Sequence, residues 1–185
     1  MGASKSRLKG KRILAVDDEV DILETIEDIL EEAQVDRAQD YETASAKIRG
    51  GRYDLAVLDI MGVDGLKLLD EAVERGIPAV MLTAHAINPE TLMASIRRGA
   101  ISYLPKETLV ELDTLLADLL DAYESGRPPW KLLFDRLGEY FNERFGPGWK
   151  EKDRDFWSQF SRTYQVGKGI ASRMSKDPRV RDKGF

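Results

Sequence analysis

The stretch Tyr53-Asp54-Leu55-Ala56-Val57-Leu58-Asp59 holds four consecutive apolar residues and ends in a carboxylate. A short apolar run that stops at a polar residue is typical of a buried strand that reaches a loop. Similar runs predict strands at 12–16, 77–82 and 101–104, and a weaker one at 35–39. Apolar residues at helical spacing predict helices over 22–30, 42–49 and 66–74, from about 89, and over 109–123.

This order of elements indicates the fold class. Five strands alternating with five helices, each joined by a few residues, imply βαβ units. We therefore expect an α/β fold with a mostly parallel sheet and helices on both of its faces. Ligands of such sheets bind at the carboxyl ends of the strands, so the residues that follow the strands are the functional candidates.

The residues at those strand ends are polar and chemically related. Asp17 and Asp18 follow the first strand, Asp59 ends the third, and Thr83 and Lys106 follow the fourth and fifth. Three carboxylates that meet without a cation repel one another, and a divalent ion relieves that repulsion. Oxygen ligands favour a hard ion such as Mg²⁺, which commonly also binds phosphate oxygens. The pattern therefore predicts a magnesium site that receives a phosphoryl group.

The same residues suggest a division of catalytic roles. Lys106 is suited to neutralise one phosphoryl oxygen and Thr83 to donate a hydrogen bond to another. Asp59 is then the candidate nucleophile, because the central apolar strand would hold its carboxylate rigidly. Asp17 and Asp18 occupy a loop suited to wrapping a metal.

Several motifs together resemble the receiver domains of bacterial two-component response regulators. They are the pair Asp17-Asp18, the stretch 53–59, the pair Asp64-Gly65, the pair Thr83-Ala84 and the run Gly99-Ala100-Ile101-Ser102-Tyr103-Leu104-Pro105-Lys106. The resemblance covers roughly residues 10–124. It is specific because the five motifs occur in order and at the expected spacing.

The resemblance implies a fold and a set of roles. The sheet would be flavodoxin-like and five-stranded, and Asp59 would accept a phosphoryl group from a sensor histidine kinase or a phosphotransfer protein. Asp18, Asp59 and the backbone carbonyl of Met61 would contact Mg²⁺ directly, with Asp17 acting through water. Thr83 and Tyr103 would form a switch pair in which the tyrosine ring turns inward on phosphorylation. Such a protein is no enzyme beyond its own phosphorylation and dephosphorylation.

Two positions depart from the family pattern. The loop from Asp59 to Asp64 is about two residues shorter than usual, which affects the geometry at Met61. Glu107 follows Lys106 where the family commonly has a proline with a cis bond. A cis bond before a residue other than proline costs about 2.5–4 kcal/mol, so we expect this peptide to be trans or, if cis, strained.

Composition excludes several other classes of protein. The 185 residues are 42% hydrophobic and 33% charged, with no cysteine and one histidine. Thiol catalysis, disulfides and zinc sites built on cysteine are therefore excluded. No window is apolar enough for a membrane span and no signal-peptide pattern begins the chain, so we expect a cytoplasmic protein.

Charge and aromatic content divide the chain near residue 126. Residues 1–126 hold 14 Lys and Arg against 25 Asp and Glu, whereas residues 127–185 hold 14 against 8. Of the 15 Phe, Tyr and Trp residues, 11 lie after residue 126. We therefore predict two parts, a receiver domain at 10–125 and a helical C-terminal extension with a basic tail at 126–185.

The extension has the pattern of a helical hairpin. One helical face carries an apolar stripe from Trp130 to Phe145, the glycines and proline of 146–148 end that helix, and a second aromatic helix is predicted over 151–164. A hairpin of about 40 residues cannot bury such stripes alone. It must pack on its own receiver, on a second copy in a homodimer, or on a signalling partner.

Three kinds of output follow from this pattern. We expect signalling through protein contacts, because the second helix is aromatic and mixed in charge, and this pattern disfavours sequence-specific DNA binding. A DNA-binding transcriptional regulator with an atypical output domain and an adaptor with a silent receiver are the alternatives. The excess of positive charge lies in 167–185, which is either a solvated tail or a nonspecific phosphate contact.

Overall fold

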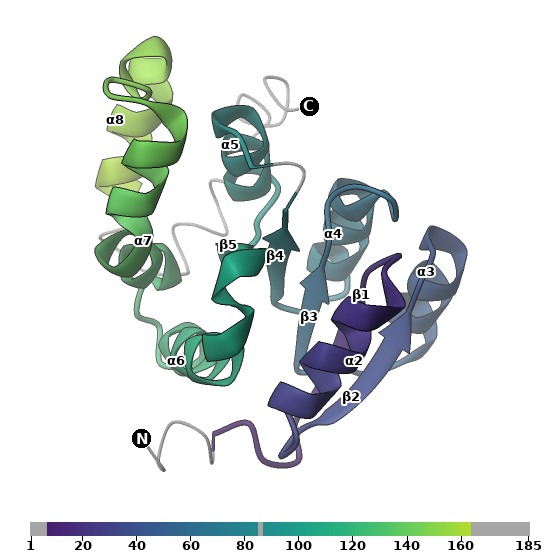
Figure 1. Cartoon of the computed structure of the whole chain (residues 1–185). Coiled ribbons are helices and arrows are strands. Elements are labelled where there is room, and N and C mark those ends of the chain that lie inside the picture. The colour runs from purple at the N-terminus through teal and green to yellow at the C-terminus, as the bar shows by residue number, and fades with distance from the viewer. Residues whose placement is uncertain (1–6, 85–86, 164–185) are drawn as a thin grey trace.

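A parallel sheet forms the centre of the computed structural model, which describes residues 7–84 and 87–163. Its five strands lie in the order β2-β1-β3-β4-β5 (Figure 1). They are β1 (Arg12–Val16), β2 (Gln34–Ala38), β3 (Leu55–Leu58), β4 (Ala79–Thr83) and β5 (Ser102–Pro105). The predicted α/β fold with five parallel strands is confirmed.

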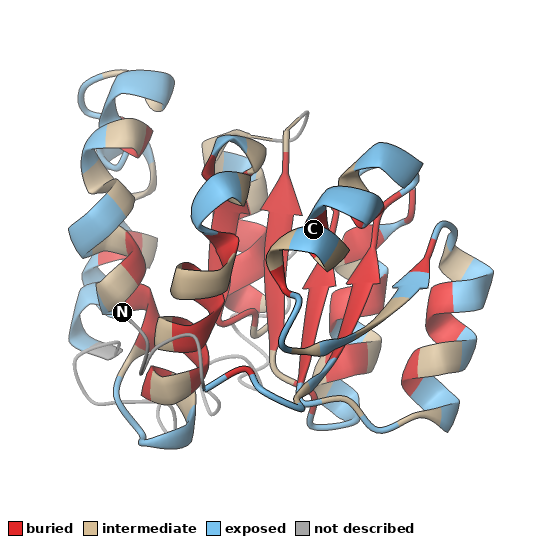
Figure 2. Cartoon of the chain, turned by 60° about the horizontal axis from the view of Figure 1, so that its bottom comes forward, coloured by how far each residue is buried: buried red, intermediate tan, exposed pale blue. Residues whose placement is uncertain are grey.

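Burial along the strands follows from their positions in the sheet. Every residue of β3, β4 and β5 is buried, as is all of β1 after its first residue (Figure 2). The sequence of such a strand is a continuous apolar run because helices cover both of its faces. In β2, at the edge, only Ala38 is buried, which explains why its sequence pattern is weak.

Helices cover the two faces of the sheet (Figure 1). One face carries α2 (Val20–Ile29) and α6 (Leu112–Glu124), and the other carries α3 (Tyr41–Gly50), α4 (Gly65–Glu74) and α5 (Pro89–Arg97). Caps explain where two of these helices begin, because Asp40 and Asn88 each accept a hydrogen bond from the backbone N–H three residues later.

The beginning of the helix expected at 109–123 differs from the prediction. A 3₁₀ helix, η1 (Lys106–Glu111), precedes α6, which starts at Leu112. The Thr108 hydroxyl donates a hydrogen bond of 2.7 Å to the carbonyl of Pro105, and this bond supports the tighter turn after β5. The other predicted boundaries agree with the structure within a few residues.

The C-terminal elements are α7 (Pro129–Phe145), η2 (Glu151–Asp153) and α8 (Arg154–Thr163). We call α7, η2 and α8 the hairpin. The hairpin lies beside β5, α5 and α6 at one edge of the sheet (Figure 1), and it buries Trp130, Leu133 and Phe141. The apolar stripe of α7 therefore packs within the chain. The basic tail expected at 167–185 lies outside the described residues.

Within the described ranges, the structure holds no helix both long and apolar enough to cross a membrane.

Candidate functional site

The predicted site residues meet at the carboxyl edge of the sheet. Asp17 directly follows β1, Asp59 directly follows β3, Thr83 ends β4, and Lys106 directly follows β5. Asp17, Asp59 and Thr83 are buried, and so is the side chain of Lys106. Asp18, which follows Asp17, is exposed. Because the parallel strands end together, residues distant in the sequence form one polar cluster.

Lys106 is the centre of this cluster. Its Nζ atom lies 2.8 Å from Oδ2 of Asp17, 3.3 Å from Oδ2 of Asp59 and 3.2 Å from Oε1 of Glu19. The second oxygens of the two aspartates accept backbone hydrogen bonds, from the N–H of Glu19 to Asp17 and from that of Ile60 to Asp59. Both carboxylates are thus held from two sides, with Oδ2 turned toward the ammonium. No role for Glu19 in the site was predicted from the sequence.

One ammonium shared among several carboxylates leaves the cluster short of positive charge. Burial raises the pKa of Asp17, and the charge of Asp59 raises it further against the hydrogen bond from Lys106. Burial alone would lower the pKa of Lys106, but the hydrogen bond to Asp17 and the charges of Asp59 and Asp17 raise it to about 12. Lys106 therefore stays charged, and the excess carboxylate charge favours an additional cation.

The carboxylate oxygens have the chemistry that a hard divalent ion requires. Among the described residues, Asp17, Asp18 and Glu19 form one group whose carboxylate oxygens lie within 4.8 Å of one another. These are oxygen ligands only, and they suit Mg²⁺. The exposed Asp18 sits at the open side of the cluster, where an ion can enter from water. The acidic group that the structure shows contains two of the predicted ligands, Asp17 and Asp18, together with Glu19, and its oxygen chemistry suits Mg²⁺.

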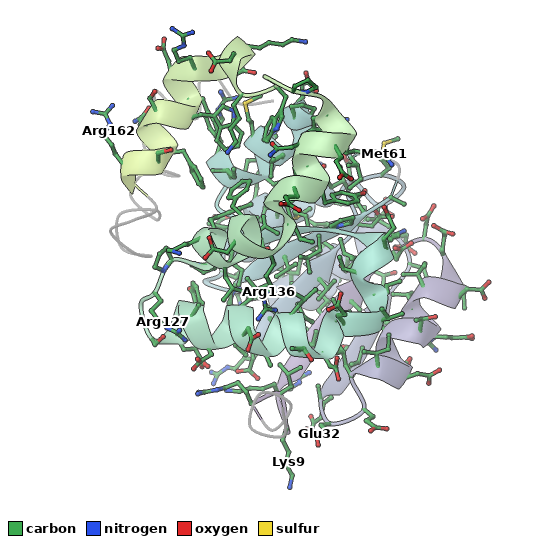
Figure 3. All side chains as sticks on the ribbon, turned by 60° about the vertical axis from the view of Figure 1, so that its left-hand side comes forward. Lys9, Glu32, Met61, Arg127, Arg136 and Arg162 are labelled. Atoms are coloured by element: carbon green, nitrogen blue, oxygen red, sulfur yellow. The ribbon has the colours of Figure 1, made fainter. Side chains whose placement is uncertain are left out.

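The loop after β3 is closed tightly around Asp59. The N–H of Gly65 donates a hydrogen bond of 2.9 Å to the carbonyl of Ile60. A Cβ atom on Gly65 would lie 1.7 Å from the carbonyl oxygen of Asp59, and one on Gly62 would lie 2.5 Å from Oδ2 of Asp18. Glycine at these two positions lets the short loop approach the backbone of Asp59 and the carboxylate of Asp18. Met61 is 54% exposed, and its side chain projects from this loop (Figure 3), so its backbone carbonyl is the candidate ligand.

Thr83 and Tyr103 lie on the same face of neighbouring strands, because Thr83 pairs with Pro105 and Met81 pairs with Tyr103. The Thr83 hydroxyl is buried and has no hydrogen-bond partner within the described part of the chain. The Tyr103 hydroxyl accepts a bond of 3.3 Å from the N–H of Asn88 and lies 2.8 Å from the hydroxyl of Thr91. A buried hydroxyl without a partner is costly, so Thr83 is a donor that an incoming oxygen would satisfy.

Comparison with known proteins agrees with this geometry. A sequence profile described as "Response regulator receiver domain" matches residues 13–119, which is more than half of the chain. The chain belongs to the response regulator receiver family. The resemblance identified from the motifs is thereby confirmed for the receiver.

Named relatives of this receiver come from distant organisms. The two-component response regulator ARR10 of Arabidopsis thaliana is 33% identical over 109 residues, which cover 55% of this chain and 20% of ARR10. The transcriptional regulatory protein TcrA of Mycobacterium tuberculosis is 34% identical over 137 residues, which cover 69% of this chain and 53% of TcrA. The match therefore spans about a fifth of the length of ARR10 and about half of the length of TcrA.

A solved structure supports the same assignment. The CheY-like response regulator receiver domain protein of Methanospirillum hungatei superimposes with a TM-score of 0.53 at 31% identity, covering 61% of this chain and 98% of the other. The receiver fold thus accounts for the sheet and the helices around it, and the hairpin adds to it.

At Glu107, where this receiver departs from the family pattern, the structure shows a local contact. No cis peptide bond occurs among the residues that the structure describes, so the bond between Lys106 and Glu107 is trans. The Glu107 carboxylate instead accepts a hydrogen bond of 2.6 Å from the hydroxyl of Tyr140 on α7. The Tyr103 ring, which the resemblance expects to turn inward on phosphorylation, is fully buried here.

Proposed function

We propose that Asp59 accepts a phosphoryl group from a phosphohistidine of a sensor histidine kinase or a phosphotransfer protein. An oxygen of the Asp59 carboxylate attacks phosphorus, the bond between phosphorus and the imidazole nitrogen breaks, and the imidazole leaves with the bonding electron pair. One observation supports this most strongly. The Asp59 carboxylate lies 3.3 Å from the Lys106 ammonium, and Thr83, at the end of the neighbouring strand β4, has a buried hydroxyl with no hydrogen-bond partner among the described residues.

Each residue of the cluster has a role in this proposal. Lys106 holds a positive charge near Oδ2 of Asp59, where it pairs with one oxygen of the transferred group. The Thr83 hydroxyl donates to another. The N–H of Ile60, 2.8 Å from Oδ1 of Asp59, keeps the carboxylate oriented. The Asp59 carboxylate is held by Lys106 and Ile60 before the phosphoryl donor arrives, so little reorganisation of the nucleophile accompanies the reaction.

Mg²⁺ is part of the proposal because the donor set fits it. Asp18, Asp59 and the backbone carbonyl of Met61 would hold the ion, and Asp17 would hold it through water. When bound, the ion would neutralise charge on the phosphoryl oxygens. The raised pKa of Asp17 and the sharing of one lysine among several carboxylates support a requirement for this additional cation.

Labelling with a small phosphodonor tests the assignment. The whole chain is incubated with acetyl phosphate, with and without Mg²⁺, and the phosphoprotein is quantified by intact-mass spectrometry before and after hydroxylamine. We expect Mg²⁺-dependent, hydroxylamine-sensitive phosphorylation that Asp59→Asn abolishes. Asp54→Asn is the matched control, since Asp54 lies at the opposite end of the same stretch and bonds the N–H of Arg12 at 2.9 Å. Equal labelling of wild type and Asp59→Asn would refute the role of Asp59.

For the output we propose protein contacts made by the hairpin, with a signalling partner or with a second copy in a homodimer, because α8 is aromatic and mixed in charge. A DNA-binding transcriptional regulator is the second candidate, since TcrA is named a transcriptional regulatory protein. Against it, α8 buries Trp157 and Phe160. Each has a ring-centroid distance of about 6 Å to Phe134 of α7. A recognition helix needs an exposed polar face that enters the major groove.

Binding measurements separate these outputs. A sequence-specific DNA complex at physiological salt that survives deletion of 167–185 would establish the transcriptional regulator. Partner binding that is the same in wild type, in Asp59→Ala and with a phosphoryl mimic would establish a silent adaptor. Sedimentation with and without phosphorylation would test the homodimer.

A further inference from the structure

The aromatic side chains of the hairpin fall into two groups. One group packs on the receiver. The Trp130 indole donates a hydrogen bond of 3.0 Å to the carbonyl of Ala100, and the Phe141 ring centroid lies 6.0 Å from that of Tyr103. The other group meets inside the hairpin, where α7 and α8 lie side by side (Figure 1). The phosphorylation proposed for the receiver does not involve these inner rings.

Three of the inner rings surround one cation. Phe134 of α7, Trp149 of the turn after α7 and Trp157 of α8 form a group that we call the cage. The Nζ atom of Lys150 lies 4.9 Å from the ring centroid of Phe134, 5.4 Å from that of Trp149 and 5.0 Å from that of Trp157. At distances below about 6 Å, the face of an aromatic ring attracts a cation.

The walls of the cage stand at steep angles to one another. The ring plane of Trp157 is inclined by 82° to that of Trp149 and by 87° to that of Phe134. Nearly perpendicular rings can turn their faces toward one point, which stacked rings cannot do. Trp149 and Trp157 are only 5% and 6% exposed, whereas Lys150 is exposed. Lys150 therefore lies on the solvent side of the cage.

The cage offers the Lys150 ammonium no hydrogen-bond acceptor. Within the part of the chain that the structure describes, this ammonium has no ion pair and no hydrogen bond, and burial lowers the pKa of Lys150. The N–H donors of an ammonium need acceptors, which water supplies and ring faces replace poorly. A quaternary ammonium has no N–H donor and keeps its charge at every pH. The cage therefore suits a quaternary ammonium better than the lysine that occupies it.

We propose that the cage is a binding site for a small quaternary ammonium compound of the choline type, and that Lys150 occupies it as an internal competitor. The cation of the ligand takes the place of the Lys150 Nζ atom, with its methyl groups against the three ring faces. The displaced lysine turns into water, where its ammonium gains hydrogen bonds. The site belongs to the hairpin, so its occupation does not depend on phosphorylation of Asp59.

Proton NMR of choline chloride titrated with the full chain tests this site at constant ionic strength. The methyl signal of choline moves upfield when the methyl groups lie over ring faces. The neutral isostere 3,3-dimethylbutan-1-ol, with carbon in place of the charged nitrogen, separates attraction of the cation from apolar binding. Lys150→Ala removes the competitor, and adding Phe134→Leu to it removes one wall. Lys131→Ala is the matched control, because Lys131 lies on the same hairpin but pairs with Asp135 at 2.8 Å.

We expect Lys150→Ala to bind choline about tenfold more tightly than wild type, as for the loss of a competitor that occupies the site about nine-tenths of the time. Lys131→Ala should bind as wild type does, and adding Phe134→Leu to Lys150→Ala should weaken binding. The isostere should bind Lys150→Ala at least about fivefold more weakly than choline, which corresponds to about 1 kcal/mol of attraction between cation and rings.

Two results would overturn the inference. In the first, the choline signal stays unmoved with Lys150→Ala, although circular dichroism shows that this variant is folded. In the second, the isostere binds as tightly as choline, so that the cage is an apolar surface covered by a lysine. The isostere requires no change in the cage, so the test stands even if Phe134→Leu destabilises the hairpin.

Discussion

Replacing Gly65 by alanine tests how closely the loop after β3 is fitted to Asp59. The added Cβ would lie 1.7 Å from the carbonyl oxygen of Asp59, whereas real Cβ contacts essentially never fall below 3.0 Å. Backbone must therefore move by at least 1.3 Å. The neighbouring atoms are the backbone of Asp59 and Ile60, which are fixed by hydrogen bonds from Asp59 to Val16 and from Gly65 to Ile60.

We expect Gly65→Ala to lower the free energy of unfolding by about 3 kcal/mol, the upper part of the usual range for overpacking. With a urea dependence of about 2 kcal/mol per M, the unfolding midpoint would fall by about 1.5 M. A displacement of about 1 Å in a reacting group typically costs about 10²-fold in rate, so phosphorylation of Asp59 should slow by about that factor.

The assays are urea unfolding followed by far-UV circular dichroism, and the acetyl phosphate reaction. Gly138→Ala is the control, because Gly138 lies inside α7 with no atom within 4 Å of an added Cβ. It should stabilise the protein by about 1 kcal/mol, since alanine is the better helix former. A Gly65→Ala protein with the wild-type midpoint and wild-type phosphorylation would refute the reasoning.

Two further changes test contacts away from the loop. Burial alone would raise the pKa of Glu71, but hydrogen bonds from Ser45 and Tyr41 lower it below its ordinary 4.5. This stabilisation is present above pH 4.5 and is lost as the pH falls through the lowered pKa. Urea unfolding at several pH values should therefore give Glu71→Gln a lower free energy of unfolding than wild type at pH 7, and the difference should shrink in acid. A deficit independent of pH would contradict this. Trp130→Phe leaves the buried carbonyl of Ala100 without its donor, so the free energy of unfolding in urea should fall by about 1–3 kcal/mol. A change near zero would show that this hydrogen bond contributes nothing to stability.

The receiver could be predicted from sequence because its signals are local. The apolar run before Asp59 indicates a strand that is buried on both faces. Because parallel strands end at the same edge of the sheet, the topology brings Asp59 close to Asp17 and Lys106. The contact of Lys106 with Glu19 does not follow, because an exposed glutamate at the start of a helix looks like any solvated residue. It depends on a side-chain conformation that a sequence pattern does not encode.

The hairpin shows the same limit more clearly. Helical spacing identifies which face of α7 is apolar, but not the surface that the face meets. Phe141 and Tyr103 are 38 positions apart in the sequence, and no periodicity connects them. The bond between Glu107 and Tyr140 likewise joins a position that departs from the family pattern to a residue of the extension. Such pairs are defined only once both elements are placed in space.

The opposite charges of the two parts contribute little to hairpin docking. Arg136 with Asp118 and Arg127 with Asp121 pair across the boundary, but their side chains are 24–60% exposed. Exposed pairs contribute at most about 1 kcal/mol each. Burial of Trp130, which is 4% exposed, contributes about 1.5–3 kcal/mol, and each of the other buried apolar side chains adds a similar amount.

Salt therefore provides a direct test of what holds the hairpin in place. All three tryptophans lie in residues 127–163, so their fluorescence during urea unfolding reports the hairpin. Raising NaCl from about 0.1 M to 1 M shortens the screening length from about 10 Å to about 3 Å. If apolar burial dominates, the fluorescence midpoint should stay constant or rise, since salt does not weaken apolar burial. If, at 1 M NaCl, the urea midpoint from fluorescence falls well below the midpoint from circular dichroism, charge attraction holds the hairpin on the receiver.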